Sequence, residues 1–545
     1  MNLSKRKGLS HNRQNLIDRR IILSLFVVAL VAEVIGAYII IYQNGHAMPD
    51  AVSRTANAYY VLNIIPHKLA SIGFVWNPLP SLLQLIILPF DNLWPPLATD
   101  AMAGSILTAI FAASNAALIY HYLRAFKTDR LVSIIIVVLY TANPFIFYYG
   151  CNGMSEIIFF TFIILSTGSL SLWIVDRKSS RFVTIGVALA FAFLTRYETF
   201  ALCVSFFIAL VIIVYTMKDE YSPFKHKSAR MKLDYTVASS TVIFLPVAYT
   251  VLIWIFLNWT IMSDPFFFLT SAYSNDAQSD AAVWAQFEDG IRSPLNAIKF
   301  ALIRMLPFSP LFIIITIERI ITKRLFKWDY LILLILIFGI SIFHIVMLMN
   351  GKSFGWLRFF SFALPFCVAW IPYEIYKLKG DAKIITTGFL CVALAISGAI
   401  MPSYFKDYSL AREEYMAFYQ PEDQQLIAQK ELSQIVNSKY KNDIILMDSF
   451  IGAKFIMNLD RPENLITTTS DEFEYAVKNP KKYKVDYLIV PQSMYTGQLD
   501  AINKEYPNLF SDGGSWLELV YDNEMYRIYK VAGVALPSER AGDTK

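Results

Sequence analysis

The chain has 545 residues, of which 56% are hydrophobic and only 17% are charged, and its formal net charge is +5. Soluble domains typically carry about 25% charged residues, so this composition excludes an ordinary soluble globular protein. Many apolar runs reach the ~20 residues that a helix needs to cross a bilayer. We therefore predict a polytopic α-helical membrane protein whose partner is the lipid bilayer, with no nucleic-acid partner. The four cysteines lack metal-ligand spacing and imply no disulfide framework.

Eleven apolar runs are predicted to cross the membrane. They are Ile21–Tyr42, Ala101–Leu123, Leu131–Tyr149, Ser155–Val175, Phe182–Thr195, Phe200–Met217, Tyr235–Trp259, Ile298–Ile321, Tyr330–Asn350, Trp356–Tyr376 and Ile384–Met401. The first run lacks a small-residue cleavage site, so we interpret it as a retained span and not as a signal peptide. The run Leu82–Phe90 is too short to span and is expected to dip into the interface.

Basic residues in the short loops predict the orientation of these spans. They precede the first run and follow the second, fourth, sixth, eighth and tenth: Lys5, Arg6, Lys7, Arg13, Arg19, Arg20, Arg124, Lys127, Arg130, Arg177, Lys178, Arg181, Lys218, Lys225, Lys227, Arg230, Lys232, Arg319, Lys323, Arg324, Lys327, Lys377, Lys379 and Lys383. Basic loops stay in the cytoplasm, which places residues 1–20 there. The loops 43–100 and 258–297, and everything after residue 402, are then extracytoplasmic, on a plasma membrane that we expect to be bacterial.

The orientation depends on the apolar stretch from Phe182 to Met217, which TRYET interrupts at Arg196 and Glu198. As one helix it would be about 51 Å long, too long for a single crossing. We predict two spans joined by a minimal outer turn. The alternative is one kinked, strongly tilted helix, which would invert the orientation of every later loop.

Residues 403–545 have the composition of a soluble domain, which we predict to be a small extracytoplasmic α/β domain. Helices are expected at Gln420–Asn437, Phe450–Asn458 and Leu499–Tyr506, and buried strands at Asp443–Asp448 and Tyr487–Val490. The segment WLELVYDNEMYRIYKV predicts a hairpin around Asp522–Asn523. There is no glycine-rich phosphate loop and no nucleophile elbow, so we expect a covering domain without chemistry. A substrate-docking lid is the alternative.

The first outer loop carries the most informative polar residues. Asp50 and Arg54 stand at helical i,i+4 spacing in NGHAMPDAVSRTANAYYVLN. The pattern from Ala51 to Ser71 predicts a helix lying along the membrane surface, whose shared face holds Tyr59, Tyr60, Leu62, Ile65 and Leu69. An acid and a base at this boundary suit a substrate with a lipid tail and a polar head. The alternative is a solvated loop with a weak surface ion pair.

Charged residues also stand at the outer ends of later spans, where burial in the membrane is costly. Glu156 opens an apolar span, and its alternative role is to meet the dipole of the first helical turn. Arg196 and Glu198 could pair with each other at the turn. Arg358 could reach the interface by snorkelling, or contact a phosphate. The acidic residues of the loop Asn258–Ala297 are expected to form a solvated face, although this loop could fold over a site: Asp264, Asp276, Asp280, Glu288 and Asp289.

In this order along the chain, several motifs resemble the GT-C superfamily of integral membrane glycosyltransferases, closest to its protein mannosyltransferase and aminoarabinose transferase branch. They are AMPDAVSR, GFVWNPLP, NPFIFYYGCNGMSEIIFF, LTRYETFAL, NWTIMSDPFFFLTSAYS and LRFFSFALP. The resemblance covers roughly residues 21–365 and implies a GT-C-like transmembrane domain over residues 21–402. The first loop holds a lone Asp50 where a common pattern of that branch has an adjacent acidic pair. No cofactor is therefore assigned, and a divalent metal ion stays an open expectation.

The resemblance implies transfer of a sugar from a polyprenyl-phosphate donor to a hydroxyl of a glycan, lipid or protein acceptor. It implies that Asp50 is the general base and that Glu156 orients the acceptor or Asp50, or holds a metal. Its remaining site residues would contact the lipid phosphate or the sugar: Arg54, His67, Lys68, Trp76, Arg196, Glu198 and Arg358. We expect Asp50, Glu156 and Arg196 to face a common pocket at the outer leaflet.

Two other classes of protein remain open. A transporter or flippase of a lipid-linked sugar would place ionisable groups near mid-membrane, where Glu33 is the main exception in otherwise uncharged spans. An assembly protein without catalysis could use its outer domain to recruit partners.

Overall fold

The computed structural model describes residues 3–217, 224, 227–280, 293–420 and 423–533. Four residues named above, Lys218, Lys225, Glu288 and Asp289, lie outside them. The chain forms two compact units, each discontinuous in sequence. The first, the membrane unit, is Met1–Ile39, Ser105–Trp254 and Gly290–Tyr419; the second, the mixed unit, is Ile40–Gly104, Ile255–Asp289 and Gln420–Lys545.

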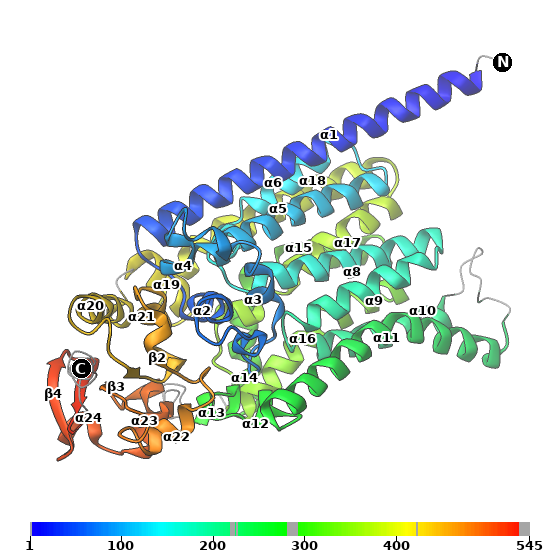
Figure 1. Ribbon diagram of the computed structural model, residues 1–545. Coiled ribbons are helices and arrows are strands. Elements are labelled where there is room, and N and C mark those ends of the chain that lie inside the picture. The colour runs from blue at the N-terminus through cyan, green and yellow to red at the C-terminus, as the bar shows by residue number, and fades with distance from the viewer. Residues whose placement is uncertain (1–2, 218–223, 225–226, 281–292, 421–422, 534–545) are drawn as a thin grey trace. The chain divides into compact units, whose positions relative to one another are not determined.

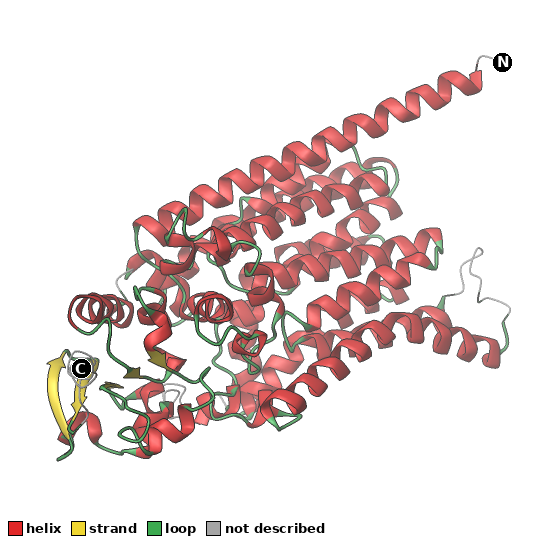
Figure 2. Ribbon diagram, viewed as in Figure 1, coloured by secondary structure: helices red, strands yellow, loops and turns green. Residues whose placement is uncertain are grey.

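The membrane unit is helical (Figures 1 and 2). Its helices are α1 (Leu3–Ala37), α5 (Met102–Ala125), α6 (Arg130–Thr141), α7 (Pro144–Cys151), α8 (Glu156–Asp176), α9 (Ser180–Phe193), α10 (Thr199–Thr216), α11 (Ala229–Met262), α14 (Pro294–Met305), η5 (Leu306–Phe308), α15 (Pro310–Ile321), α16 (Trp328–Met349), η6 (Leu357–Phe360), α17 (Ala363–Lys377), α18 (Gly380–Phe405) and α19 (Arg412–Tyr419). The predicted class, a polytopic helical membrane protein with a small C-terminal sheet domain, is confirmed.

The predicted count of eleven spans is not confirmed. Among the described residues, eight helices are long and apolar enough to cross a membrane, or up to ten if each of two bent pairs counts as one span. The fifth predicted run, Phe182–Thr195, corresponds to α9, which has 14 residues. A helix of that length is about 21 Å long, short of the ~30 Å hydrocarbon core.

Two predicted spans, Leu131–Tyr149 and Ile298–Ile321, are each formed by a bent pair of helices. The axes of α6 and α7 differ by 67°, and the segment Pro294–Phe308 meets α15 at 87°. Each second helix begins with proline, Pro144 or Pro310. Proline has no N–H to donate and fits the first position of a new helix, so the break falls where it stands.

The TRYET region separates two helices, as predicted, while the crossing of the membrane by both of them and the outer position of the turn stay predictions. α9 ends at Phe193 and packs along α8, whereas α10 begins at Thr199 and packs along α16. α8 is the central span, since 94% of its 18-residue apolar stretch is buried, whereas only 17% of the corresponding stretch of α11 is buried. The start of α1, the α5–α6 turn and the α8–α9 turn lie at one end of this unit (Figure 1).

Ion pairs fasten the helices at this basic end. Asp18 of α1 accepts hydrogen bonds from Arg130 (Nε, 2.7 Å) and Arg124 (Nε, 3.2 Å), which flank the α5–α6 turn. Arg181 pairs with Asp176 across the α8–α9 turn at 3.1 Å. The predicted basic loops 124–130 and 177–181 therefore lie at the same end of the membrane unit as the N-terminal segment.

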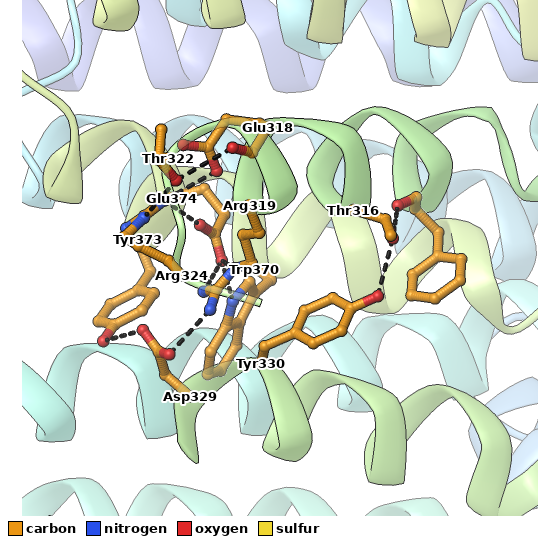
Figure 3. A network of polar contacts seen from close by, with 11 residues as sticks. Thr316, Glu318, Arg319, Thr322, Arg324, Asp329, Tyr330, Trp370, Tyr373 and Glu374 are labelled. Carbon is orange, nitrogen blue, oxygen red and sulfur yellow. Dashed lines mark hydrogen bonds and ion pairs between the residues drawn. The ribbon is translucent and has the colours of Figure 1, made fainter. Parts of the chain in front are cut away.

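Arg319 is the centre of a buried network in this unit (Figure 3). Its side chain is 0% exposed and pairs with Asp329 (2.8 Å) and Glu374. Tyr373 and Trp370 donate to the same two carboxylates. The sequence placed Arg319 among the basic residues of a short cytoplasmic loop. The structure buries it because Glu374, inside an apolar run, supplies the opposite charge.

The mixed unit contains short helices and one sheet. Its elements are η1 (Tyr38–Gln43, a π-helix), α2 (Pro49–Asn63), η2 (Leu69–Ile72), α3 (Leu79–Gln84), η3 (Leu88–Phe90), α4 (Pro96–Thr99), α12 (Phe267–Thr270), α13 (Asn275–Asp280), α20 (Gln424–Lys439), β1 (Ile445–Leu446), η7 (Ser449–Ile451), α21 (Ala453–Met457), η8 (Pro462–Asn464), β2 (Leu465–Ile466), α22 (Phe473–Lys478), β3 (Tyr487–Pro491), η9 (Tyr495–Leu499), α23 (Ala501–Glu505), α24 (Leu509–Asp512), β4 (Leu517–Asp522) and β5 (Tyr526–Val531).

The sheet has the order β2-β1-β3-β5-β4, in which β1 pairs parallel to β2 and β3 and the other pairs are antiparallel. β3 is buried along its whole length, and its Leu488 and Val490 pack in one core with Leu446 and Tyr529. The predicted hairpin is β4–β5, and the predicted helices and strands of this domain each overlap an element. Strand β2 was not predicted, since two residues leave no readable alternation.

The surface helix predicted for residues 51–71 was wrong in length. α2 ends at Asn63, three residues before Pro66. Proline disfavours the helical conformation of the residue that precedes it, so a helix is expected to end before Pro66. Tyr59 and Tyr60 are buried, whereas Ile65 and Leu69 are exposed, so the proposed shared face does not exist.

Candidate active site

Asp50 lines a pocket in the mixed unit. It stands in the first turn of α2, directly after Pro49, and is half-buried. The pocket has a volume of about 370 Å³ and is lined by residues of 49–76, of 273–278 and of 423–468. Helix α2 and the segment after it therefore contribute one wall, and the C-terminal segment another.

Two other predicted residues lie beside Asp50, but in different settings. Trp76 lines the pocket, and the buried guanidinium of Arg54 lies over its ring at 5.5 Å from the centroid. Such a contact fixes the indole plane and helps to keep a buried cation in place. Arg54 itself does not line the pocket. In this geometry it positions Trp76, and its predicted contact with substrate stays a prediction.

His67 and Lys68 do not line the pocket. His67 is exposed, and the Lys68 Nζ pairs with Asp471 at 2.5 Å. The Asp471 side chain is 81% exposed, and an ion pair so open to water contributes little stability. The phosphate contact predicted for one of these two residues stays a prediction.

In the membrane unit, Glu156 is the centre of a second polar cluster. Its side chain is 1% exposed and pairs with Arg196 and, at 3.3 Å, with the Nη1 of Arg358. Ser155 precedes it but makes no side-chain cap hydrogen bond; its hydroxyl accepts one from Arg196 at 3.1 Å. Glu156 and Arg196 thus meet as expected, while Asp50 belongs to the other unit and its place beside them stays a prediction.

Carboxylates already engage both arginines of this cluster. Arg196 donates to Glu198 through Nη2 (2.6 Å) and Nε (3.0 Å), and Arg358 pairs through Nε with Glu413 at 3.0 Å. Two guanidinium groups therefore face three carboxylates, counting Glu156. The pairing of Arg196 with Glu198, which the sequence offered as an alternative to a site role, is therefore present in the structure. A lipid phosphate that bound these arginines would have to replace one of the carboxylates.

Sequence reasoning missed several members of this cluster. His344 of α16 lies 3.6 Å from Glu198 and stacks on the Phe359 ring at a centroid distance of 4.9 Å. Glu414 of α19 accepts a hydrogen bond from Tyr149 at 2.7 Å, and burial raises the pKa of its carboxyl. The sequence signals that could have identified them are the single histidine, His344, in an apolar run and the acidic pair Glu413 and Glu414 after the last predicted span.

The possible divalent metal has no ready-made ligand set in the described ranges. No group of three or more His, Cys, Asp or Glu side chains there is placed to hold an ion. We therefore derive no step through a metal.

Comparison with known proteins gives one informative likeness. No protein-family model and no curated protein sequence matches the chain. Among solved structures, the crystal structure of ArnT from Cupriavidus metallidurans bound to undecaprenyl phosphate matches with a TM-score of 0.53 and 10% identity. The match covers 96% of this chain and 99% of that one. The oligosaccharyltransferase of Archaeoglobus fulgidus, in its apo form, matches with a TM-score of 0.42 and 12% identity over 95% and 75% of the two chains. Only the first value is high enough to show a shared fold.

Proposed function

Because the chain has a GT-C-like fold, we propose that it is a membrane glycosyltransferase that moves a sugar from a polyprenyl-phosphate donor to an acceptor hydroxyl at the outer face of the plasma membrane. The observation that carries this proposal is the position of Asp50 in the lining of a pocket, in a chain with this fold. The similar ArnT structure has undecaprenyl phosphate bound, which favours a lipid phosphate as the leaving group.

In the proposed reaction, the acceptor oxygen attacks the anomeric carbon of the sugar. The new C–O bond forms as the bond between that carbon and the phosphate oxygen breaks, and the polyprenyl phosphate leaves with the electron pair. Asp50 accepts the proton of the attacking hydroxyl. General-base help of this kind is typically worth about 10²–10⁴-fold in rate.

The arginines Arg196 and Arg358 have a proposed role toward the leaving phosphate. Guanidinium groups bind phosphate oxygens in two-point contacts, and fixed cations at a developing charge lower a barrier by roughly 3–4 kcal/mol. Since Glu156, Glu198 and Glu413 hold these arginines in the structure, the phosphate would exchange with a carboxylate on binding.

The test compares three strains: one lacking the protein, one with Asp50→Asn and one with Asp460→Asn. Asp460 is an exposed carboxylate of the same unit, which pairs with Lys441 at 3.5 Å, so its loss should be nearly neutral. Mass spectrometry of lipid-linked sugars should show one polyprenyl-phosphate sugar accumulating in the first two strains and not in the third. Normal sugar transfer by Asp50→Asn protein at normal abundance would exclude the base role.

One observation favours the alternative of a flippase. Glu33 lies inside the first span, is 2% exposed and packs against Gly150, where an added Cβ would stand 2.6 Å from its carboxylate. Proteoliposomes carrying a fluorescent polyprenyl-phosphate sugar distinguish the two functions. A flippase would move the lipid between leaflets, and Glu33→Gln would stop it; the transferase would leave the distribution unchanged.

A further inference from the structure

The wall of the Asp50 pocket formed by the C-terminal segment is polar. Asp423 caps α20, Gln425 and Gln429 lie on that helix, and Lys454 lies on α21; all four line the same pocket as Asp50. The sequence favoured a covering domain without chemistry. Here the segment instead supplies hydrogen-bonding groups to a pocket that already holds the proposed base.

Hydrogen bonds to the backbone hold these side chains in place. The Oε1 atom of Gln429 accepts from the N–H groups of Lys454 (2.9 Å) and Phe455 (3.2 Å). The amide oxygen is thereby fixed, and the orientation of the amide nitrogen is fixed with it. This nitrogen also bonds the Tyr526 hydroxyl, which leaves one of its two N–H donors for a ligand. Likewise, Oδ1 of Asp423 accepts from the N–H groups of Gln425 (2.9 Å) and Leu426 (3.3 Å).

Aromatic faces complete the lining. Tyr60, Trp76, Tyr273 and Phe450 line the pocket, and the last two rings lie 4.8 Å apart between centroids. Tyr60 is 4% exposed, and across the described ranges its hydroxyl has no hydrogen-bond partner. A buried hydroxyl without a partner is unfavourable, so a ligand hydroxyl that reaches it would be stabilised.

The charges of the described lining residues disfavour an anionic ligand. Its ionisable side chains of the Asp, Glu, Lys, Arg and His types are Asp50, Asp423 and Lys454. Asp100 already engages the Lys454 ammonium, at 2.6 Å. Among the described lining residues, a phosphate or a uronate would therefore meet two carboxylates and one lysine that already has a carboxylate partner, which electrostatic repulsion disfavours.

These features match one chemical class of ligand. A sugar ring has apolar C–H faces that pack on aromatic rings, and hydroxyl edges that pair with amides and carboxylates. The volume of about 370 Å³ is at the lower end of the ~300–1,000 Å³ typical of small-molecule sites, so the ligand is of the size of a short saccharide. A neutral or amine-bearing sugar is also compatible with a lining that holds two carboxylates and one lysine.

We infer that this pocket binds the acceptor through a neutral or amino sugar, and that Gln429 and Asp423 determine this specificity. The inference rests on the proposed transferase function, and it narrows the acceptor from a glycan, lipid or protein to a glycan. The lipid phosphate of the donor is then held outside this pocket.

The test measures sugar binding, which needs no turnover, on the full chain in lipid nanodiscs. Saturation-transfer NMR is recorded with methyl glucoside, glucosamine and glucose 1-phosphate. Gln429→Glu keeps the oxygen acceptor but removes the N–H donors, and Gln424→Glu makes the same change at an exposed position of the same helix. Asp423→Asn keeps the cap oxygen and removes the charge.

We expect methyl glucoside, which is uncharged, and glucosamine, which is cationic, to bind, and glucose 1-phosphate not to bind. Gln429→Glu should weaken methyl glucoside binding about 3–10-fold, the effect of one hydrogen bond, while Gln424→Glu stays within about twofold of wild type. Asp423→Asn should weaken glucosamine binding more than methyl glucoside binding. If Gln429→Glu does not fold, Gln425→Ala, on the same wall, replaces it with the same expected loss.

Glucose 1-phosphate binding as tightly as methyl glucoside would overturn the inference, and so would equal losses in Gln429→Glu and Gln424→Glu. The two proposals fail separately. If sugars do not bind but Asp50→Asn stops transfer, only the glycan specificity is wrong. If sugars bind but Asp50→Asn leaves transfer intact, the pocket is a carbohydrate site without the proposed base.

Discussion

Arg196 and Glu156, forty residues apart in the sequence, form an ion pair at the start of α8, and the carboxylate is almost completely buried. The same guanidinium also holds Glu198, so one side chain joins the first turn of α8 to the α9–α10 turn. The pair therefore has a structural consequence that does not depend on any substrate.

We expect Arg196→Met to lower the free energy of unfolding by roughly 3–5 kcal/mol, because it leaves buried carboxylates without their partner. Thermal unfolding of the full chain in detergent measures this loss. Arg181→Met is the matched control, since the Arg181–Asp176 pair is about one quarter exposed and should contribute no more than about 1 kcal/mol. Equal losses in both variants would contradict a structural role for Arg196.

Gly168 marks the close approach of α8 to α5. A Cβ built on it would stand 2.6 Å from two ring carbons of Tyr122, whose hydroxyl donates to the Leu165 carbonyl at 2.9 Å. The anchored ring cannot move aside easily, so Gly168→Ala should destabilise the protein by about 1–3 kcal/mol.

Gly388→Ala is the control for this substitution, because Gly388 of α18 has open space at its Cβ position and alanine favours helix there. It should leave the thermal unfolding temperature unchanged or raise it. In a Tyr122→Ala background, Gly168→Ala should lose its effect; a persistent loss there would show that another contact limits this site.

Asp500 makes the stability of the mixed unit depend on pH. Burial raises the pKa of its carboxyl well above the ordinary value, and the charge of the nearby Asp448 raises it further. The folded state then binds the proton more tightly than the unfolded state, in which the pKa is about 3.9. The stabilisation is full below about pH 4 and is lost as pH rises through the raised folded pKa.

Asp500→Asn removes the charge and keeps the oxygen that accepts from the N–H groups of Ile502 and Asn503. We expect it to raise the unfolding temperature at about pH 8 and to flatten its decline between about pH 5 and pH 8. Thermal scans of the full chain across this range test the prediction. Asp512→Asn, an exposed carboxylate nearby, should leave the pH profile unchanged. A steeper decline in Asp500→Asn would reverse the sign we derive.

The proposed orientation can be checked by cysteine labelling. Asp381 at the start of α18 and Asp460 in the C-terminal segment are both exposed. With a membrane-impermeant maleimide, we expect Asp460→Cys to react in intact cells and Asp381→Cys only after permeabilisation, as the basic loops predict. The native cysteines are buried or half-buried, so the unmodified protein serves as the blank. The opposite pattern would place the C-terminal segment in the cytoplasm.

The sequence by itself determined the class of protein and the place of most helices. Apolar runs of span length leave a chain few alternatives in a bilayer, because every backbone N–H and C=O must be paired inside a helix. The break at TRYET could also be predicted, because a single helix from Phe182 to Met217 would be too long for one crossing. Alternating residues around Asp522–Asn523 likewise specified the β4–β5 hairpin.

The tertiary structure alone decided which charges far apart in the sequence meet in the Glu156–Arg358 and Arg319 contacts. Glu156 and Arg358 are 202 residues apart, and no local pattern links them. In the sequence, Arg319 resembles the other basic residues of the cytoplasmic loops, and only the structure places Glu374 and Asp329 beside it. The Asp50 pocket likewise needs Gln429 and Lys454 from the far end of the chain. Periodicity and hydropathy describe neighbours along one element, whereas a site depends on contacts between elements, which only packing in three dimensions selects.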